Sequence, residues 1–230
     1  MQIIMISLSF ILLTVVIYYV MNVVYFKFKR DYLLPILTST IVIILILLIF
    51  NIPYETYMLG GKYIDSILGP AIVALAIPLY KQREVLKQNL VPIIAGVTVG
   101  VVIGMSSGIV FSKAFGFSTE IILTLLPKSI TTPVAIQIVS TIGGVTSLTA
   151  VFVMIAGFTG AIVGPTLFKI IKVDTAIGQG IGYGAASHVI GTSKAIEYGE
   201  EAGSMSSVAM ILCAVVGSVM GPLMAWIFLM

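Results

Sequence analysis

Four apolar runs in this sequence are each long enough for an α-helix to cross a lipid bilayer. They cover Ile3–Phe26, 90–111, 148–168 and 204–229, and none of them contains a charged residue. The hydrocarbon core of a bilayer is about 30 Å thick and takes about 20 helical residues to cross. Charged residues make up only 9% of the chain, against roughly 25% in soluble domains. The sequence therefore predicts an integral membrane protein and excludes soluble enzymes and nucleic-acid binders.

Two further segments, 33–50 and 64–80, bring the expected total to about six transmembrane helices, the second being interrupted at Gly69-Pro70. The helix expected at 90–111 carries glycine at every fourth position, namely Gly96, Gly100, Gly104 and Gly108. Glycines on one helix face let a neighbouring backbone approach closely. We therefore expect this helix to pack tightly inside a bundle, and the alternative is the ordinary glycine content of a transmembrane helix.

Lysine and arginine are concentrated in three loops, at 27–30, 81–87 and 169–172. By the positive-inside rule these loops face the cytoplasm and the N-terminus faces outward. The loop near Lys113 is then outside, so the chain must cross the membrane a net odd number of times before it reaches the third basic loop. Because only one long apolar run lies between them, the segment 119–141 is expected to begin and end on the same side.

That segment consists of two short apolar arms around a polar centre. The arms, Glu120–Leu126 and 134–139, are too short to span a bilayer, and the centre at 127–133 contains two prolines. A re-entrant hairpin with an unwound tip satisfies both the length and the topology, provided that protein or a water-filled cavity satisfies its backbone. The alternative is a pair of short crossing helices joined by a proline turn.

A similar arrangement recurs before the last crossing, with a short arm at 174–181 and a polar, glycine-containing centre at 182–194. The long helices that follow the two hairpins align so that Ser147 pairs with Ser204, Gly160 with Gly217, and Gly164-Pro165 with Gly221-Pro222. An odd number of crossings separates the two copies, so they would have opposite orientations in the membrane. This predicts an inverted-topology repeat, which is a signature of secondary transporters. Chance resemblance between glycine-rich helices is the alternative.

The polar centres of the two hairpins are the candidate binding site, because polar groups inside a membrane are costly and usually functional. Broken helices direct half-helix N-termini, which carry a partial positive charge, toward an anion. Hydroxyl groups and lysines nearby would complete a site for a small carboxylate. The candidate substrate-binding residues are Lys128, Ser129, Thr131 and Thr132 in the first hairpin and Ser187, His188, Gly191, Thr192, Ser193 and Lys194 in the second.

Proton coupling has two candidate residues, His188 and Glu197. Histidine titrates near neutral pH and is therefore suited to proton transfer. A hydrogen-bonded structural histidine is the alternative for His188. Lys128 and Lys194 could instead extend to the membrane interface, as long basic side chains often do.

The sequence favours no catalytic residue, metal site or cofactor. His188 is the only histidine and has no orienting aspartate for a Ser-His-Asp triad. Its spacing from Glu197 is not a ligand pattern for a metal, and Cys213 is the only cysteine. The net charge of +3 includes no basic block for nucleic acid. An intramembrane hydrolase is a poorly supported alternative.

Three motifs resemble the LrgB/CidB family, whose members are called holin-like or antiholin-like membrane proteins and include the plastid glycolate/glycerate translocator. They lie at Gly69–Lys81, Leu126–Pro133 and Ser187–Glu197, in the family's order. The family usually reads Ala-His-Gly-Ile-Gly-Thr-Ala-Lys-Ala in the third motif. Here Ser187, Val189 and Ser193 replace Ala, Gly and Ala. The general role should survive these changes, whereas the bulk of Val189 beside His188 puts the substrate preference in doubt.

The resemblance implies an all-α, multi-pass protein of the bacterial plasma membrane with two competing functions. One is a secondary carrier of small carboxylates such as pyruvate, glycolate or glycerate, for which the inverted repeat, by analogy with other carriers, suggests ion coupling and an elevator-like movement of residues 113–230 (transport core) past residues 1–112 (scaffold). The other is a holin/antiholin-like regulator of murein hydrolase activity and lysis. The expected partners are a small organic anion, membrane lipid, a small LrgA/CidA-type membrane protein and a second copy of the chain.

Overall fold

The computed structural model describes residues 2–30, 33–67, 70, 73, 76–81 and 83–229. Every regular element in this part of the chain is a helix, which confirms the all-α prediction. The chain divides into two compact units, Met1–Ala74 and Leu75–Met230. This division follows packing, and the functional boundary expected at residue 112 stays a prediction.

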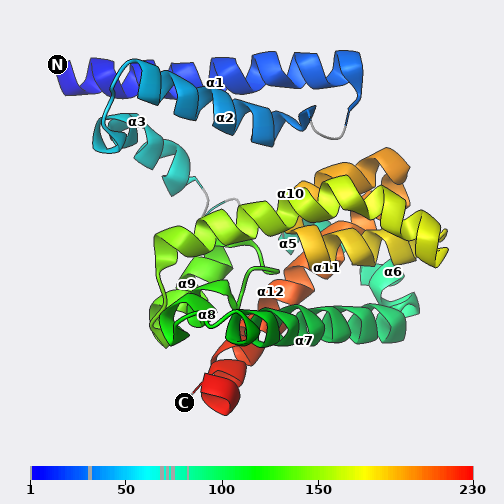
Figure 1. Cartoon of the computed structure of the whole chain (residues 1–230). Helices are drawn as coiled ribbons and strands as arrows, with labels where there is room; N and C mark the ends of the chain where they lie inside the picture. The colour runs from blue at the N-terminus through cyan, green and yellow to red at the C-terminus, as the bar shows by residue number, and fades with distance from the viewer. Residues whose placement is uncertain are drawn as a thin grey trace. The chain divides into compact units, whose positions relative to one another are not determined.

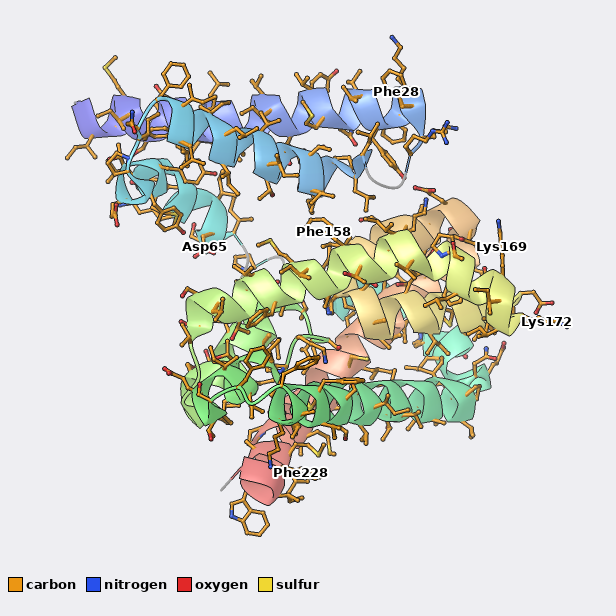
Figure 2. All side chains as sticks on the ribbon, in the orientation of Figure 1. Phe28, Asp65, Phe158, Lys169, Lys172 and Phe228 are labelled. Carbon is orange, nitrogen blue, oxygen red and sulfur yellow. The ribbon has the colours of Figure 1, made fainter. Side chains whose placement is uncertain are left out.

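The first unit contains α1 (Gln2–Phe28), α2 (Pro35–Ile49) and α3 (Tyr54–Ser66). Helices α1 and α2 lie side by side, and α3 folds back onto α1 (Figure 1). The close contact depends on Gly60, because a Cβ at this position would lie 2.8 Å from the Cβ of Phe10. In this unit Phe28 marks the end of α1 and Asp65 lies at the end of α3 (Figure 2).

Among the described residues, four helices have the length and hydropathy to cross a membrane, and they match the four long runs expected from the sequence. They are α1, α7 (Leu90–Ala114), α10 (Thr146–Ile171) and α12 (Glu200–Leu229). Helix α2 is apolar but has only 15 residues, fewer than the roughly 20 of a full crossing. Part of the predicted crossing at 64–80 lies outside the described residues, including Gly69 of the first family motif. The count of six crossings therefore stays a prediction.

The second unit contains the other helices. After α5 (Ala76–Lys81) and α6 (Arg83–Gln88) come α7, α8 (Thr119–Leu125), α9 (Thr132–Ile142), α10, α11 (Ala176–Ala195), a 3₁₀ turn η2 (Ile196–Tyr198) and α12. Helices α7 and α10 run in opposite directions, and α8 and α9 lie at the end where α7 finishes and α10 begins (Figure 1). This arrangement fits a segment that begins and ends on one side of a membrane, and its insertion into lipid stays a prediction.

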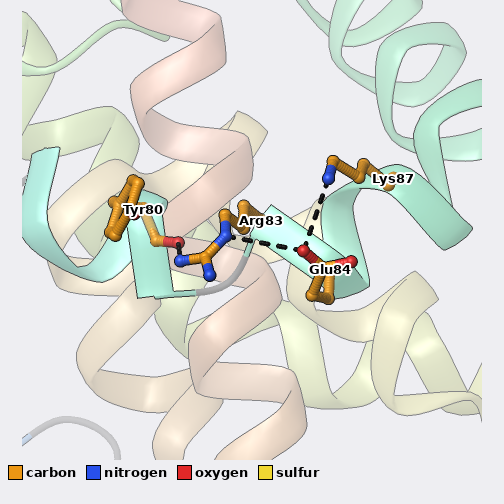
Figure 3. Close-up of polar contacts among 4 residues, drawn as sticks. All are labelled: Tyr80, Arg83, Glu84 and Lys87. Carbon is orange, nitrogen blue, oxygen red and sulfur yellow. Dashed lines mark hydrogen bonds and ion pairs between the residues drawn. The ribbon is translucent and has the colours of Figure 1, made fainter.

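Charged residues in the second unit gather at helix ends and at the α5–α6 corner. Lys169 and Lys172 lie at the C-terminal end of α10 (Figure 2). At the corner, Glu84 receives Arg83 Nε at 3.4 Å and Lys87 Nζ at 3.3 Å (Figure 3). These pairs are exposed, and such pairs contribute little stability, typically less than about 1 kcal/mol. These charged residues therefore bear on orientation in the membrane more than on stability, because both clusters belong to the loops expected on the cytoplasmic side.

The glycine-bearing face of α7 is covered along its length, as expected from the four-residue spacing. Gly96 faces Ile181, Gly100 faces Ala185, Gly104 faces Ser129 and Gly108 faces Lys128. The prediction of a tightly packed helix at 90–111 is confirmed. Gly96 and Gly100 thus lie against α11, and Gly104 and Gly108 lie against the loop between α8 and α9.

Helices α11 and α12 approach each other closely through Gly180 and Gly184. A Cβ on Gly184 would collide with the carbonyl oxygen of Ser206 and lie 2.9 Å from the Cβ of Ala209. Backbone atoms cannot turn aside as a flexible side chain can. The absence of a side chain at residue 184 is therefore what allows the two helices to touch.

We predict that Gly184→Ala lowers the free energy of unfolding by about 1–3 kcal/mol, because the added methyl group must push α11 away from α12. Thermal melting of the purified protein in detergent measures the effect. Gly61→Ala is the matched control, since its Cβ would meet the flexible tip of Met58. The control should be neutral or stabilising, as alanine is favoured over glycine in helices, and an equal loss in both variants would contradict the packing argument.

Candidate functional site

The first helix break separates α8 from α9. Residues 126–131 form turns without a helix, and α9 begins at Thr132 with Pro133 in its first turn. Proline is suited to this position because the amide that it lacks would have no helical partner. Thr131 precedes the helix with an extended backbone, and its side chain does not cap the free N–H groups. This end of α9 therefore presents partial positive charge into the break.

Lys128 lies within the first break and extends toward α7. Its ammonium group donates a hydrogen bond of 2.6 Å to the carbonyl oxygen of Gly104. Gly108, one turn further along α7, leaves room for this group, because a Cβ there would lie 3.0 Å from Lys128 Nζ. Among the described residues no carboxylate pairs with Lys128. Its positive charge is thus held by a backbone carbonyl alone.

The second helix break occurs at His188, within α11. His188 has φ 49° and ψ −127°, the conformation of the first central residue of a type II′ turn, which favours glycine. The chain folds back here, because a Cβ on Gly191 would lie 2.5 Å from the carbonyl oxygen of Tyr183. In a straight helix these residues would be about 12 Å apart. The break is therefore one residue long, much shorter than the polar centre at 182–194 that the sequence indicates.

The two breaks adjoin each other. The backbone of Lys128 is the polar neighbour of the His188 imidazole. On either side, the breaks rest against glycines of the long helices. Ser187 lies against Gly160 of α10, and Ile130 lies against Gly217 of α12. The glycines that pair in the sequence alignment thus receive opposite breaks.

Two buried polar atoms at the second break lack a hydrogen-bond partner within the described residues: Ser187 Oγ and His188 Nε2. Ser187 is fully buried and His188 is 3% exposed. An unsatisfied buried polar group typically costs about 1–3 kcal/mol, so native proteins keep few of them without a ligand, ion or water nearby. Two such atoms on consecutive residues, with the backbone of Lys128 next to the imidazole, make this place a candidate binding site.

The remaining candidate residues lie in three settings. Ser129 and Thr131 belong to the first break, where Ser129 packs on Gly104 and Thr131 is buried, while Thr132 is the first residue of α9. Thr192 shares a hydrogen bond of 2.9 Å with Ser206 of α12. Gly191 serves the contact between the two arms of α11. These residues hold the breaks in place. The Lys128 ammonium is directed to Gly104 of α7, whereas Ser187 Oγ lies against Gly160 of α10.

Ser193, Lys194 and Glu197 lie further along the second arm. Ser193 is exposed, and its hydroxyl donates to the carbonyl of Val189. Lys194 is buried and forms an ion pair of 2.6 Å with Glu197, whose side chain is partly exposed. Lys128 and Lys194, which have the same predicted role in the sequence, thus differ in the partner of the ammonium group: a carboxylate for Lys194 and a backbone carbonyl for Lys128.

Hydrogen bonds of threonine and serine hydroxyls attach each break to a long helix, and the sequence did not predict them. Thr149 of α10 donates to the carbonyl of Thr124 in α8 at 3.1 Å, and Thr124 Oγ1 accepts the N–H of Val145 at 2.9 Å. In the alignment of the two long helices Thr149 occupies the position of Ser206, which holds Thr192. The alignment therefore pairs the two hydroxyl residues, but only the contacts in the structure show what they bind.

The described residues contain no group of three or more His, Cys, Asp or Glu side chains that could hold a metal ion. The residues at the breaks carry an ammonium group, the amide of Thr132 at the start of α9, a hydroxyl and an imidazole, and each of these groups can donate a hydrogen bond.

Comparison with known proteins places these features in a family context. Residues 14–227 match the LrgB-like family. The holin-like protein CidB of Staphylococcus aureus is 42% identical over 96% of this chain and 97% of its own length. The uncharacterized protein YxaC of Bacillus subtilis is 55% identical over 97% of each chain. No solved structure matches the chain.

We predict that His188→Gly is more stable than His188→Ala by roughly 1 kcal/mol or more, because glycine adopts the backbone conformation of residue 188 without strain. Both variants lose the imidazole, so the comparison isolates the backbone. Melting temperatures of the two purified variants in detergent provide the measurement. At an ordinary exposed helical position such as Ala95, the order is reversed and Ala95→Gly should lose about 1 kcal/mol. A more stable alanine variant at 188 would show that the break is not strained.

Proposed function

The chain belongs to the LrgB-like family, and from this premise and the geometry of its helix breaks we propose that it carries small carboxylates across the bacterial plasma membrane. It would act as a multi-pass secondary carrier rather than as an enzyme. The resemblance found in the sequence suggests pyruvate, glycolate and glycerate as substrates. Its relatives in the comparison come from bacteria, which supports the plasma membrane as its location.

One observation carries the proposal: polar groups at the two adjoining breaks have no acidic partner among the described residues. Lys128 contributes an ammonium group held only by a carbonyl, and Ser187 and His188 contribute polar atoms without a partner. A carboxylate would satisfy the ammonium group, and the amide of Thr132 at the start of α9, through charge-assisted hydrogen bonds. Polar groups on a small anion would give Ser187 Oγ or His188 Nε2 the partner that it lacks among the described residues.

The crossed packing of the breaks supports an inverted repeat. Gly160 and Gly217 align in the sequence, and each receives the break of the other half. Such an exchange is what two halves related by a twofold axis in the membrane plane would produce. We propose that residues 113–230 move as a core past a scaffold of residues 1–112, as in an elevator. His188 and Glu197 remain the candidates for coupling this movement to protons.

The name of the relative CidB favours a second candidate, a holin-like function. For this function the family resemblance suggests a small LrgA/CidA-type protein or a second copy of the chain as partner. A holin-like pore would let large solutes through without saturation. It would have no need for a buried anion receptor at two helix breaks. The carrier is therefore the preferred proposal, and lysis phenotypes would follow indirectly from altered carboxylate flux.

We predict that Lys128→Ala and His188→Ala each reduce saturable counterflow of short carboxylates in proteoliposomes by about tenfold or more. The loss of a hydrogen bond to a charged group has effects of this size. Lys172→Ala, which removes an exposed lysine, is the matched control and should retain wild-type counterflow. Gel filtration in detergent verifies that each variant is folded. Wild-type rates in both site variants would remove these residues from the mechanism.

A separate measurement distinguishes carrier from pore. Vesicles that contain the wild-type protein and a trapped fluorescent dye larger than any short carboxylate should keep the dye while they exchange the carboxylates. A small saturable site accounts for this expected selectivity. Release of the dye, at a rate that short acids do not inhibit, would favour the holin-like function. Adding the small partner protein tests whether it is required for either activity.

A further inference from the structure

We infer that the carbonyl oxygen of Gly104 competes with the anion for the ammonium group of Lys128, so that Gly104 and Gly108 of α7 set the affinity of the site. This inference rests on the proposed function. The hydrogen bond of 2.6 Å between Lys128 Nζ and Gly104 O is the contact on which it depends.

Two glycines make this contact possible. A Cβ at residue 108 would lie 3.0 Å from Lys128 Nζ, so the ammonium group would have to move by a few tenths of an ångström and its hydrogen bond to Gly104 would weaken. A Cβ at residue 104 would lie 3.0 Å from the hydroxyl of Ser129 and would push the loop of the first break away from α7. Glycine at both positions lets the loop approach until the lysine reaches the helix backbone. Gly104 and Gly108 are therefore positioning residues for Lys128.

The Gly104 carbonyl is a poor permanent partner for a cation. In a regular helix it already accepts the N–H of the residue four positions later, and the hydroxyl of Ser107 donates to it at 3.1 Å. Lys128 is a third donor for an oxygen with two lone pairs. The bond holds the charge when no anion is present and is weaker than a charge-assisted bond to a carboxylate.

Competition of this kind has a definite thermodynamic sign. The empty protein is stabilised by the Lys128–Gly104 bond, and binding of an anion requires that bond to break. The apparent affinity is reduced by the fraction of molecules whose lysine is occupied. A variant in which the Lys128–Gly104 hydrogen bond is weakened should therefore bind the anion more tightly, although the substitution lies beside the site. In a carrier, this hydrogen bond keeps anion binding weak enough to allow release.

The test is the half-saturation constant for counterflow of radiolabelled pyruvate and glycolate by the full chain in proteoliposomes. Gly108→Ala should lower this constant by about two- to threefold, because the hydrogen bond is weakened and complete loss of a bond to a charged group would give roughly tenfold. Gly100→Ala is the matched control on the same helix face, because its Cβ would lie 3.2 Å from the methyl group of Ala185. The control should leave the constant unchanged.

A second variant acts in the opposite direction and does not add bulk. Ser107→Ala removes a donor that competes with Lys128 for the Gly104 carbonyl, so it should strengthen the Lys128–Gly104 hydrogen bond and raise the half-saturation constant. Melting temperatures add a check that separates competition from a simple clash. Gly108→Ala should be less stable than wild type without pyruvate and should recover most of the difference at saturating pyruvate.

The outcomes separate this inference from the proposed function. If wild-type protein shows no saturable counterflow of any short carboxylate, the proposed function fails. If wild-type counterflow is saturable but Gly108→Ala has an unchanged or higher half-saturation constant, the competition is wrong. A stability loss in Gly108→Ala that pyruvate does not reverse would also contradict it and would assign Gly108 to packing alone.

Discussion

A polypeptide that breaks its helices inside an apolar bundle must satisfy the freed polar groups within the protein. In this chain that requirement is met by glycine-lined faces on three long helices. Helix α7 receives both hairpins along its glycine stripe, and Gly160 and Gly217 receive Ser187 and Ile130. Without side chains at these positions the breaks could not come close enough for backbone and side-chain donors to meet their acceptors. Within the described part of the chain, two buried polar atoms at the second break, Ser187 Oγ and His188 Nε2, keep no hydrogen-bond partner, and this is why the proposed ligand site is placed there.

The two hairpins achieve this in different ways. The first break spans residues 126–131 and exposes the uncapped N-terminus of α9 together with Lys128. The second is confined to His188, whose backbone conformation favours glycine. Strain of this kind persists only where the surroundings enforce it, and it tends to occur at functional sites. Here the surrounding restraints are Gly191 packed on the first arm and Thr192 bonded to Ser206.

Much of the candidate site could be predicted because polar residues are rare in this chain and therefore informative. Lys128, Ser187 and His188 were identified from polar interruptions between apolar arms, and the glycine spacing predicted the close packing of α7. The hydrogen bond from Lys128 to the Gly104 carbonyl could not be predicted, because it joins residues 24 positions apart in sequence. The different roles of Lys128 and Lys194 were equally hidden. Only the fold shows that one ammonium faces a carbonyl and the other a carboxylate.

The sequence by itself determined the class of this protein: apolar runs of bilayer length, basic loops and paired polar interruptions leave an all-helical membrane protein as the consistent solution. Helix length and hydropathy are local properties, so they can be read without knowledge of contacts. The tertiary structure decided which polar groups are satisfied and which are left for a ligand. Hydrogen-bond partners depend on distances between helices, and those distances are set by where the glycines of one helix meet the breaks of another.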